Sequence, residues 1–155
     1  MAWSASKAFT AFITDNLNLT APFNVSADLL RAALYNNTIT PDQTVSSANT
    51  AYGAGIWTGA EVADVSGWPA GGRQLLSVTS TSSGNVYTLD AADTVSATSN
   101  TTLANVYGTL IYDDTLTTPV ANQGVGFIYF GSAANVTAGT FTIQWNTAGL
   151  LQITL

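Results

Sequence analysis

The feature that most constrains this chain is its shortage of charged side chains. Asp, Glu, Lys and Arg make up 8% of its 155 residues, whereas about a quarter of the residues of an ordinary soluble domain are charged. The polar surface must therefore consist largely of Thr, Ser, Asn and Gln. Exposed helix faces usually draw on Glu, Lys and Arg, while Thr suits a pleated sheet. The composition therefore favours β-structure.

Runs of alternating apolar and polar residues predict where the strands lie. The clearest runs are Leu103–Tyr112, Val125–Phe130 and Thr140–Trp145, followed by a short apolar run at Leu150–Leu155. In the first run the alternation requires a shift near Asn105. Further strands are predicted at Asp28–Tyr35, Arg73–Ser80, Val86–Ala91 and Val95–Thr98.

Strands spaced about ten residues apart, with polar turns between them, are typical of a β-sandwich or a jelly-roll barrel. A chain of this length is most simply one domain, and a 46% hydrophobic content is enough for a full core. We therefore predict a single, mainly β domain over residues 1–155. It comprises a helical segment at 1–20 and an antiparallel β-sandwich or jelly-roll-like barrel at 21–155.

The best helical candidate is Trp3–Asn16. Ala5, Phe9, Phe12 and Ile13 follow the i, i+4, i+7, i+8 spacing of one helix face. Such an amphipathic segment packs either on its own sheet or on a neighbouring subunit, and the sequence leaves both alternatives open.

A Gly-rich segment, Tyr52–Gly72, carries Trp57 and Trp68 and is predicted to be a long ordered loop or an edge segment. Loops of this length inside a compact domain are often functional. Aromatic side chains also dominate interface hot spots. The residues predicted to form an interface are Trp3, Phe9, Phe12, Trp57 and Trp68.

Charge excludes several classes of partner. Lys7, Arg31 and Arg73 are the only cations, against nine carboxylates. Nucleic acids and anionic membranes require clustered Lys or Arg, so neither is an expected partner. No run approaches the roughly 20 apolar residues of a spanning helix. The N-terminus is too polar for a signal peptide, so synthesis in a cytosol is expected.

The chain contains neither Cys nor His. Disulfides, thiolate metal sites and imidazole catalysis are therefore excluded. Asp113-Asp114 is the only adjacent acid pair, and a calcium site or a glycosidase carboxylate is the alternative to a turn. A turn is the favoured interpretation, and the same applies to Asp90 and Asp93. We expect no catalytic residues, no metal and no cofactor.

Several segments, taken together and in order, resemble short virion proteins of tailed bacteriophages. They are Arg31–Asn37 with Thr40-Pro41-Asp42, Trp68–Gly72, Ile111–Thr115, Phe127–Gly131 and Gly139–Trp145, spread over about residues 28–155. The chain is similar in these segments to capsid decoration, or cement, proteins.

The resemblance implies a structural virion protein that binds the major capsid protein on the outside of the head, often as a homotrimer, and stabilises it. Its expected location is the virion exterior, after synthesis in the bacterial cytoplasm. The alternative function is a glycan- or receptor-binding module of a tail tip or fibre, using Trp57 and Trp68 as a stacking platform. A hydrolase that relies on carboxylates alone is a third, weaker hypothesis.

Overall fold

A computed structural model describes residues 3–154, and it is mainly β, with 39% strand and 11% helix. The prediction of a mainly β chain with antiparallel sheets and a short N-terminal helix is confirmed. The strands are β1 Lys7–Ala8, β2 Leu30–Tyr35, β3 Arg73–Gln74, β4 Thr79–Ser83, β5 Val86–Asp90, β6 Thr94–Val95, β7 Thr101–Asp113, β8 Gly124–Gly139, β9 Thr142–Ile143 and β10 Leu151–Thr154. The helices are α1 Thr10–Leu17, α2 Ser47–Thr50 and the 3₁₀ helix η1 Gly55–Thr58.

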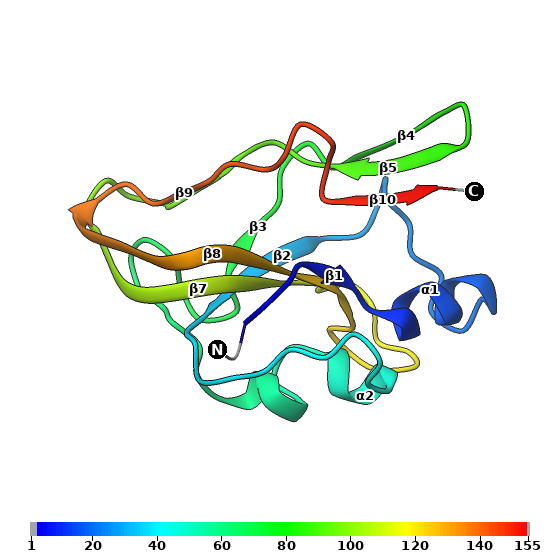
Figure 1. The fold of residues 1–155 in the computed structure, drawn as a ribbon, viewed down its shortest axis with the longest axis horizontal. Coiled ribbons are helices and arrows are strands. Elements are labelled where there is room, and N and C mark those ends of the chain that lie inside the picture. Colours follow the sequence, from blue (N-terminus) through cyan, green and yellow to red (C-terminus); the bar gives the residue numbers. More distant parts are fainter. Residues whose placement is uncertain (1–2, 155) are drawn as a thin grey trace.

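The framework is a five-stranded antiparallel sheet in the order β1-β8-β7-β2-β3 (Figure 1). Its two longest strands, β7 and β8, pair from Thr101↔Gly139 to Tyr112↔Gly124. The β7–β8 register shifts between Leu103 and Val106, where Asn105 has a φ of +57°. The predicted shift near Asn105 is therefore confirmed, and it is a β-bulge.

Two small sheets complete the fold, one in the order β10-β5-β4 and one formed by β6 and β9. In Figure 1 both lie on one side of the long strands, whereas α2 lies on the other side. β4 and β5 form a hairpin whose ends pair as Ser83↔Val86. Gly84 begins the two-residue turn with a φ of +59°, which fits a hairpin turn with Gly at its first central position.

An aromatic cluster forms the centre of the core beside the large sheet. The Trp57 ring lies 4.9 Å from the Tyr35 ring, 6.1 Å from Trp3 and 6.3 Å from Phe9, measured between ring centroids. Phe127 from β8 lies 5.4 Å from Phe9. Most of these pairs are edge-to-face, the arrangement that aromatic quadrupoles favour.

The N-terminal helix is shorter than predicted. It begins at Thr10 rather than Trp3, because Lys7–Ala8 pairs with Gly126 and Phe127 at the edge of the large sheet. Trp3 lies in the core, where its Nε1 donates to the Asn36 carbonyl at 2.9 Å. Burial of the Trp3 ring and the strand hydrogen bonds outweigh the local helical periodicity. The segment packs on its own sheet, which is the first of the two alternatives.

Three predicted strands differ clearly from the structure. The predicted strand Thr140–Trp145 is reduced to β9, Thr142–Ile143. The predicted strand Arg73–Ser80 is divided between β3 in the large sheet and β4 in a small one, and Ser77 between them has a φ of +53°. Gly131 does not end β8, which continues to Gly139. Gly131 has a φ of +83°, so the strand passes through it as an irregularity instead of stopping.

Candidate interaction surface

The predicted interface residues all belong to the core. Each is at most 4% exposed: Trp3, Phe9, Phe12, Trp57 and Trp68. Trp68 donates its Nε1 hydrogen to the Ala32 carbonyl at 3.0 Å and its ring lies 5.4 Å from Phe141. The interface prediction for these residues is therefore wrong. In the folded chain, these rings hold the N-terminal segment and the 52–72 loop against the large sheet.

The same burial removes the basis for a sugar-stacking platform. Stacking requires an exposed ring face, but Trp57 is 2% exposed and Trp68 is fully buried. Trp57 and Trp68 are therefore not the binding residues of a glycan module.

The adjacent acids Asp113 and Asp114 have different roles. Asp113 Oδ1 accepts hydrogen bonds from the backbone N–H groups of Thr115 at 2.8 Å and Leu116 at 3.2 Å, so the predicted turn is confirmed. Asp114 Oδ2 forms an ion pair with Arg31 Nε at 2.7 Å. The sequence did not reveal that Asp113 is fully buried, with an Oδ2 that lacks a hydrogen-bond partner among the described residues.

Burial raises the pKa of the Asp113 carboxyl to about 6, and the nearby Asp28 carboxylate adds to the effect. In an unfolded chain this pKa is about 3.9. The folded protein therefore binds the proton more tightly than the unfolded chain does. The contribution of Asp113 to stability is favourable at pH 4 and is lost as the pH rises through about 6.

We expect Asp113→Asn to stabilise the protein by about 2 kcal/mol at pH 7 and to remove much of the fall in stability between pH 4 and 6. The amide can still accept at Oδ1, and its Nδ2 can donate to Asp28. Urea unfolding at several pH values measures the effect. Asp28→Asn is the control: it should reduce the slope less, because burial of Asp113 remains. An unchanged slope in Asp113→Asn would refute this account.

The other acids singled out in the sequence stabilise local structure. Asp90 Oδ1 accepts from the N–H of Ala91 at 2.8 Å at the end of β5, and residues 91–93 do not form the predicted turn. Asp93 differs from its prediction, because its Oδ1 accepts from the N–H of Trp145, far along the chain, at 3.0 Å. Over residues 3–154, no three His, Cys, Asp or Glu side chains are arranged to hold a metal ion.

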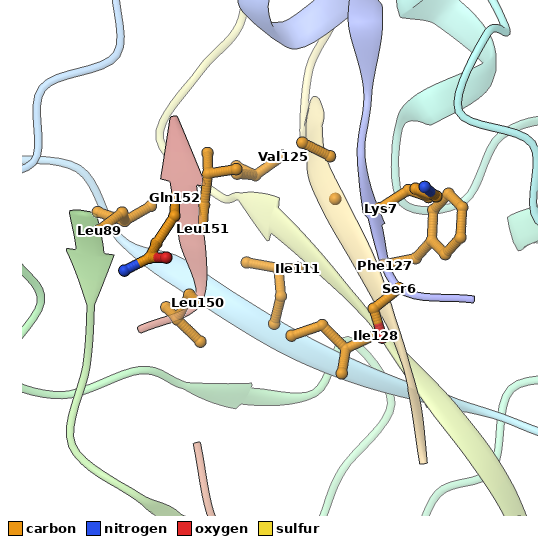
Figure 2. Close-up of a pocket in the computed structure, with 12 residues that line it drawn as sticks. Ser6, Lys7, Leu89, Ile111, Val125, Phe127, Ile128, Leu150, Leu151 and Gln152 are labelled. Carbon is orange, nitrogen blue, oxygen red and sulfur yellow. The ribbon is translucent and has the colours of Figure 1, made fainter. Parts of the chain in front are cut away.

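A groove lies between the large sheet and β10; its first part, shown in Figure 2, is lined mainly by apolar side chains, and its second part is lined by apolar and polar side chains in similar measure. One part of it, of about 340 Å³, lies between Ile111, Val125 and Ile128 of the large sheet and Leu150 and Leu151 at β10. A second part, of about 640 Å³, continues along β8 toward Phe141 and Trp145. Both parts share Ser6, Ile128, Leu150 and Gln152. We call the two parts together the β8–β10 groove.

Apolar surface continues from the groove toward α1. A hollow of about 230 Å³ lies between α1 and β10, and it shares Leu89 and Leu151 with the groove. Leu17 at its rim is 80% exposed, and Leu19 just beyond α1 is 77% exposed. Extended apolar surface of this kind usually marks an interaction site.

The groove also differs from the rest of the molecule in charge. Among the described residues that line its two parts, Lys7 is the only charged side chain. This is notable in a chain with nine carboxylates and three cations. Lys7 pairs with Phe127 and shares its face of the sheet, opposite to Ile111 and Ile128. The groove is therefore lined by uncharged side chains, on a protein whose net charge is −6 at pH 7.

Sequence reasoning found one side of this groove without recognising it. In the predicted apolar run Leu150–Leu155, alternation places Leu151, Ile153 and Leu155 on one face; Leu151 and Ile153 are half-buried while Gln152 and Thr154 are exposed, and Leu155 lies outside the described residues. The alternation shows that β10 covers something apolar. What it covers depends on the long-range pairing of β10 with β5, for which the sequence gives no local signal.

No protein-family model, curated protein or solved structure matches this chain. No helix in the described part of the chain is long and apolar enough to cross a membrane.

Proposed function

We propose that this protein is a structural virion protein that decorates the outside of a bacteriophage head, binds the major capsid protein as a homotrimer, and stabilises the shell. The observation that carries the proposal is the β8–β10 groove with the apolar surface that extends from it to α1. A binding role requires an apolar contact surface on a rigid scaffold, and no reacting groups.

The segments that resemble decoration proteins support this proposal through their position. Arg31–Asn37 contains most of β2, Ile111–Thr115 contains the end of β7, and Phe127–Gly131 lies in β8. Trp68–Gly72 packs against β2, where Gly72 lies against Ala32. Most of the resembling segments therefore lie in or against the large sheet, whereas Thr40-Pro41-Asp42 lies outside any strand and Gly139–Trp145 contains β9 of a small sheet.

Heads that lack this protein are expected to assemble but to release their DNA at a lower temperature than complete heads. Ligand binding stabilises the state that it binds, by about 2.7 kcal/mol per site at a free concentration 100 times Kd. Adding the purified protein back should therefore restore the release temperature in a saturable way. A DNA-binding dye followed during a heat ramp measures release.

Two controls test whether the exposed apolar surface binds the head and whether the protein lies on the head. Protein in which Leu17 and Leu19 are both replaced by Asp alters exposed side chains, so it should fold normally while binding heads more weakly. Electron microscopy of complete particles should place the protein on the head. Unchanged heat stability without the protein, or density only at the tail, would refute the proposal.

A further inference from the structure

The segment that precedes β2, residues 24–29, is joined to the end of β7 at Leu29. The Leu29 N–H donates to Thr115 Oγ1, and the Leu29 carbonyl accepts from the N–H of Asp114, both at 2.8 Å. We call this contact the 24–29 joint. Because few hydrogen bonds hold it, the joint can open without unfolding of the large sheet.

Two carboxyl groups meet in this joint. Asp113 Oδ1 is occupied by the N–H groups of Thr115 and Leu116, so Oδ2 is the oxygen that remains for another partner. Asp113 is fully buried, and no N–H or O–H donor reaches Oδ2 among the described residues. The side chain that meets this carboxyl, within hydrogen-bond reach, is Asp28. Two carboxyl groups can form a hydrogen bond only when one of them carries a proton.

No cation neutralises this carboxyl pair. The Arg31 guanidinium is occupied by Asp114, and no ion pair with Asp113 or its partner forms among residues 3–154. From the side of β8, the Gln123 carbonyl accepts from the Asp113 N–H at 2.9 Å, while the Gln123 side chain donates to Asp15. The like charges of the pair are therefore not compensated by a side chain.

A proton fits between the two carboxyl groups better than a metal ion does. Calcium takes six to eight oxygen ligands. Within residues 3–154, no three acidic, His or Cys side chains are arranged to hold a metal. Asp113 Oδ2 is also closed to solvent, which leaves no path for a hydrated ion. A proton requires only the two oxygens.

We propose that Asp28 and Asp113 share a proton in acid solution and thereby hold the 24–29 joint closed, and that loss of this proton in neutral solution opens the joint. Once both groups are ionised, they repel each other. Asp113 is held by two backbone N–H groups, so the half-buried Asp28 is the group that moves toward water. This inference does not depend on the proposed function.

The opening would also affect the apolar surface beside α1. Val25, within the segment, lines the hollow between α1 and β10 together with Phe23. The Phe23 ring lies 5.4 Å from the ring of Phe12 on α1. The shared proton therefore controls how firmly one wall of this hollow is held.

The direction of the pH effect follows from the two states of the joint. In the closed joint the Asp113 carboxyl keeps its proton up to a pKa of about 6. In an open joint an exposed Asp carboxyl loses its proton near a pKa of about 3.9. Opening should therefore become easier as the pH rises from about 4 to about 6, and should not change further above that.

Hydrogen exchange at the Leu29 and Asp114 amides measures opening of the joint. After correction for the intrinsic pH dependence of exchange, the opening constant should rise at least about tenfold between pH 4 and pH 7. Asp113→Asn supplies a permanent N–H donor, so its joint should stay closed over this range. Asp28→Asn supplies the donor from the other side. Because Asp28 is half-buried, this variant tests the pair even if Asp113→Asn folds poorly.

Asp114→Asn is the matched control, because it removes the adjacent acid without removing the pair. It should loosen the joint at every pH but keep the pH-dependent rise. Carbon-13 spectra of the Asp carboxyl groups give an independent readout. One carboxyl should titrate with a pKa of about 6 in the unmodified protein. This signal should be absent in Asp113→Asn and should move to a lower pKa in Asp28→Asn.

Three outcomes would overturn the proposal. One is an opening constant that does not change with pH in the unmodified protein. Another is a full pH-dependent rise in Asp28→Asn, because the repulsion would then not come from the pair. The third is closure of the joint at pH 7 by added calcium and its reversal by EDTA, because a cation would then hold the two carboxylates.

Discussion

Trp57→Ala is expected to destabilise the folded protein by about 3–5 kcal/mol, the range for removal of a large aromatic side chain from a core. Trp57 is 2% exposed and its ring contacts Tyr35, Trp3, Phe9 and Phe127. Its loss would leave a cavity at the junction of η1, the N-terminal segment and the large sheet. Because small domains are stable by about 5–15 kcal/mol, much of the stability would be lost. Urea unfolding followed by circular dichroism measures the change.

A pair of phenylalanine variants separates packing from hydrogen bonding. Trp57 Nε1 is buried without a hydrogen-bond partner among the described residues, whereas Trp68 Nε1 donates to the Ala32 carbonyl. Trp57→Phe removes an unsatisfied donor, but Trp68→Phe removes the hydrogen bond to the Ala32 carbonyl, which contributes about 0.5–1.5 kcal/mol. Trp68→Phe should therefore be the more destabilising of the two. If Trp57→Ala left stability unchanged, the aromatic cluster would not be the centre of the core.

Gly72→Ala is expected to destabilise the protein by about 3 kcal/mol or more, and to prevent accumulation of folded protein at 37 °C. Gly72 has a φ of +79°, and a Cβ at this position would lie 2.0 Å from the Ala32 carbonyl oxygen. A left-handed conformation costs about 1–2 kcal/mol for an L-residue, and overpacking a core costs a further 1–3 kcal/mol. Neither atom belongs to a flexible side chain, so relief requires the loop to move off β2.

Gly84→Ala is the matched control for this change. Gly84 also has a positive φ, of +59°, but a Cβ there meets no atom within 4 Å. It should therefore cost only the conformational term of about 1–2 kcal/mol. Thermal unfolding of the two variants and the unmodified protein gives the comparison. Equal destabilisation by both variants would show that contact with Ala32 is not the cause.

The strands with strong alternation were predictable because their periodicity reflects one buried face. β7 is an example, including the irregularity near Asn105. The N-terminal segment was not, because the burial of Trp3 against Asn36 and the pairing of Lys7–Ala8 with β8 depend on residues more than 30 positions away. Local helical spacing was present, but long-range contacts outweighed it from Trp3 to Phe9.

The interaction surface was less predictable than the fold. Aromatic side chains are common both in a domain's own core and in its interfaces with partners. The presence of Trp3, Trp57 and Trp68 in the sequence was therefore compatible with either location. The structure buries all three. The groove is instead lined by aliphatic side chains such as Ile128 and Leu151. These side chains come together only because β10 pairs with β5 beside the large sheet.

β4 has a consequence for how the molecule behaves at high concentration. All five of its side chains, Thr79 to Ser83, are exposed. None of them is charged and none is proline, the two features that often prevent a sheet edge from pairing with another molecule. At a net charge of −6, repulsion between molecules opposes contact between their β4 edges. Salt shortens the reach of that repulsion to about 10 Å at 0.1 M. Crowding on a surface under saline conditions therefore favours lateral contact between hairpins, while dilute, salt-poor solutions keep the molecules separate.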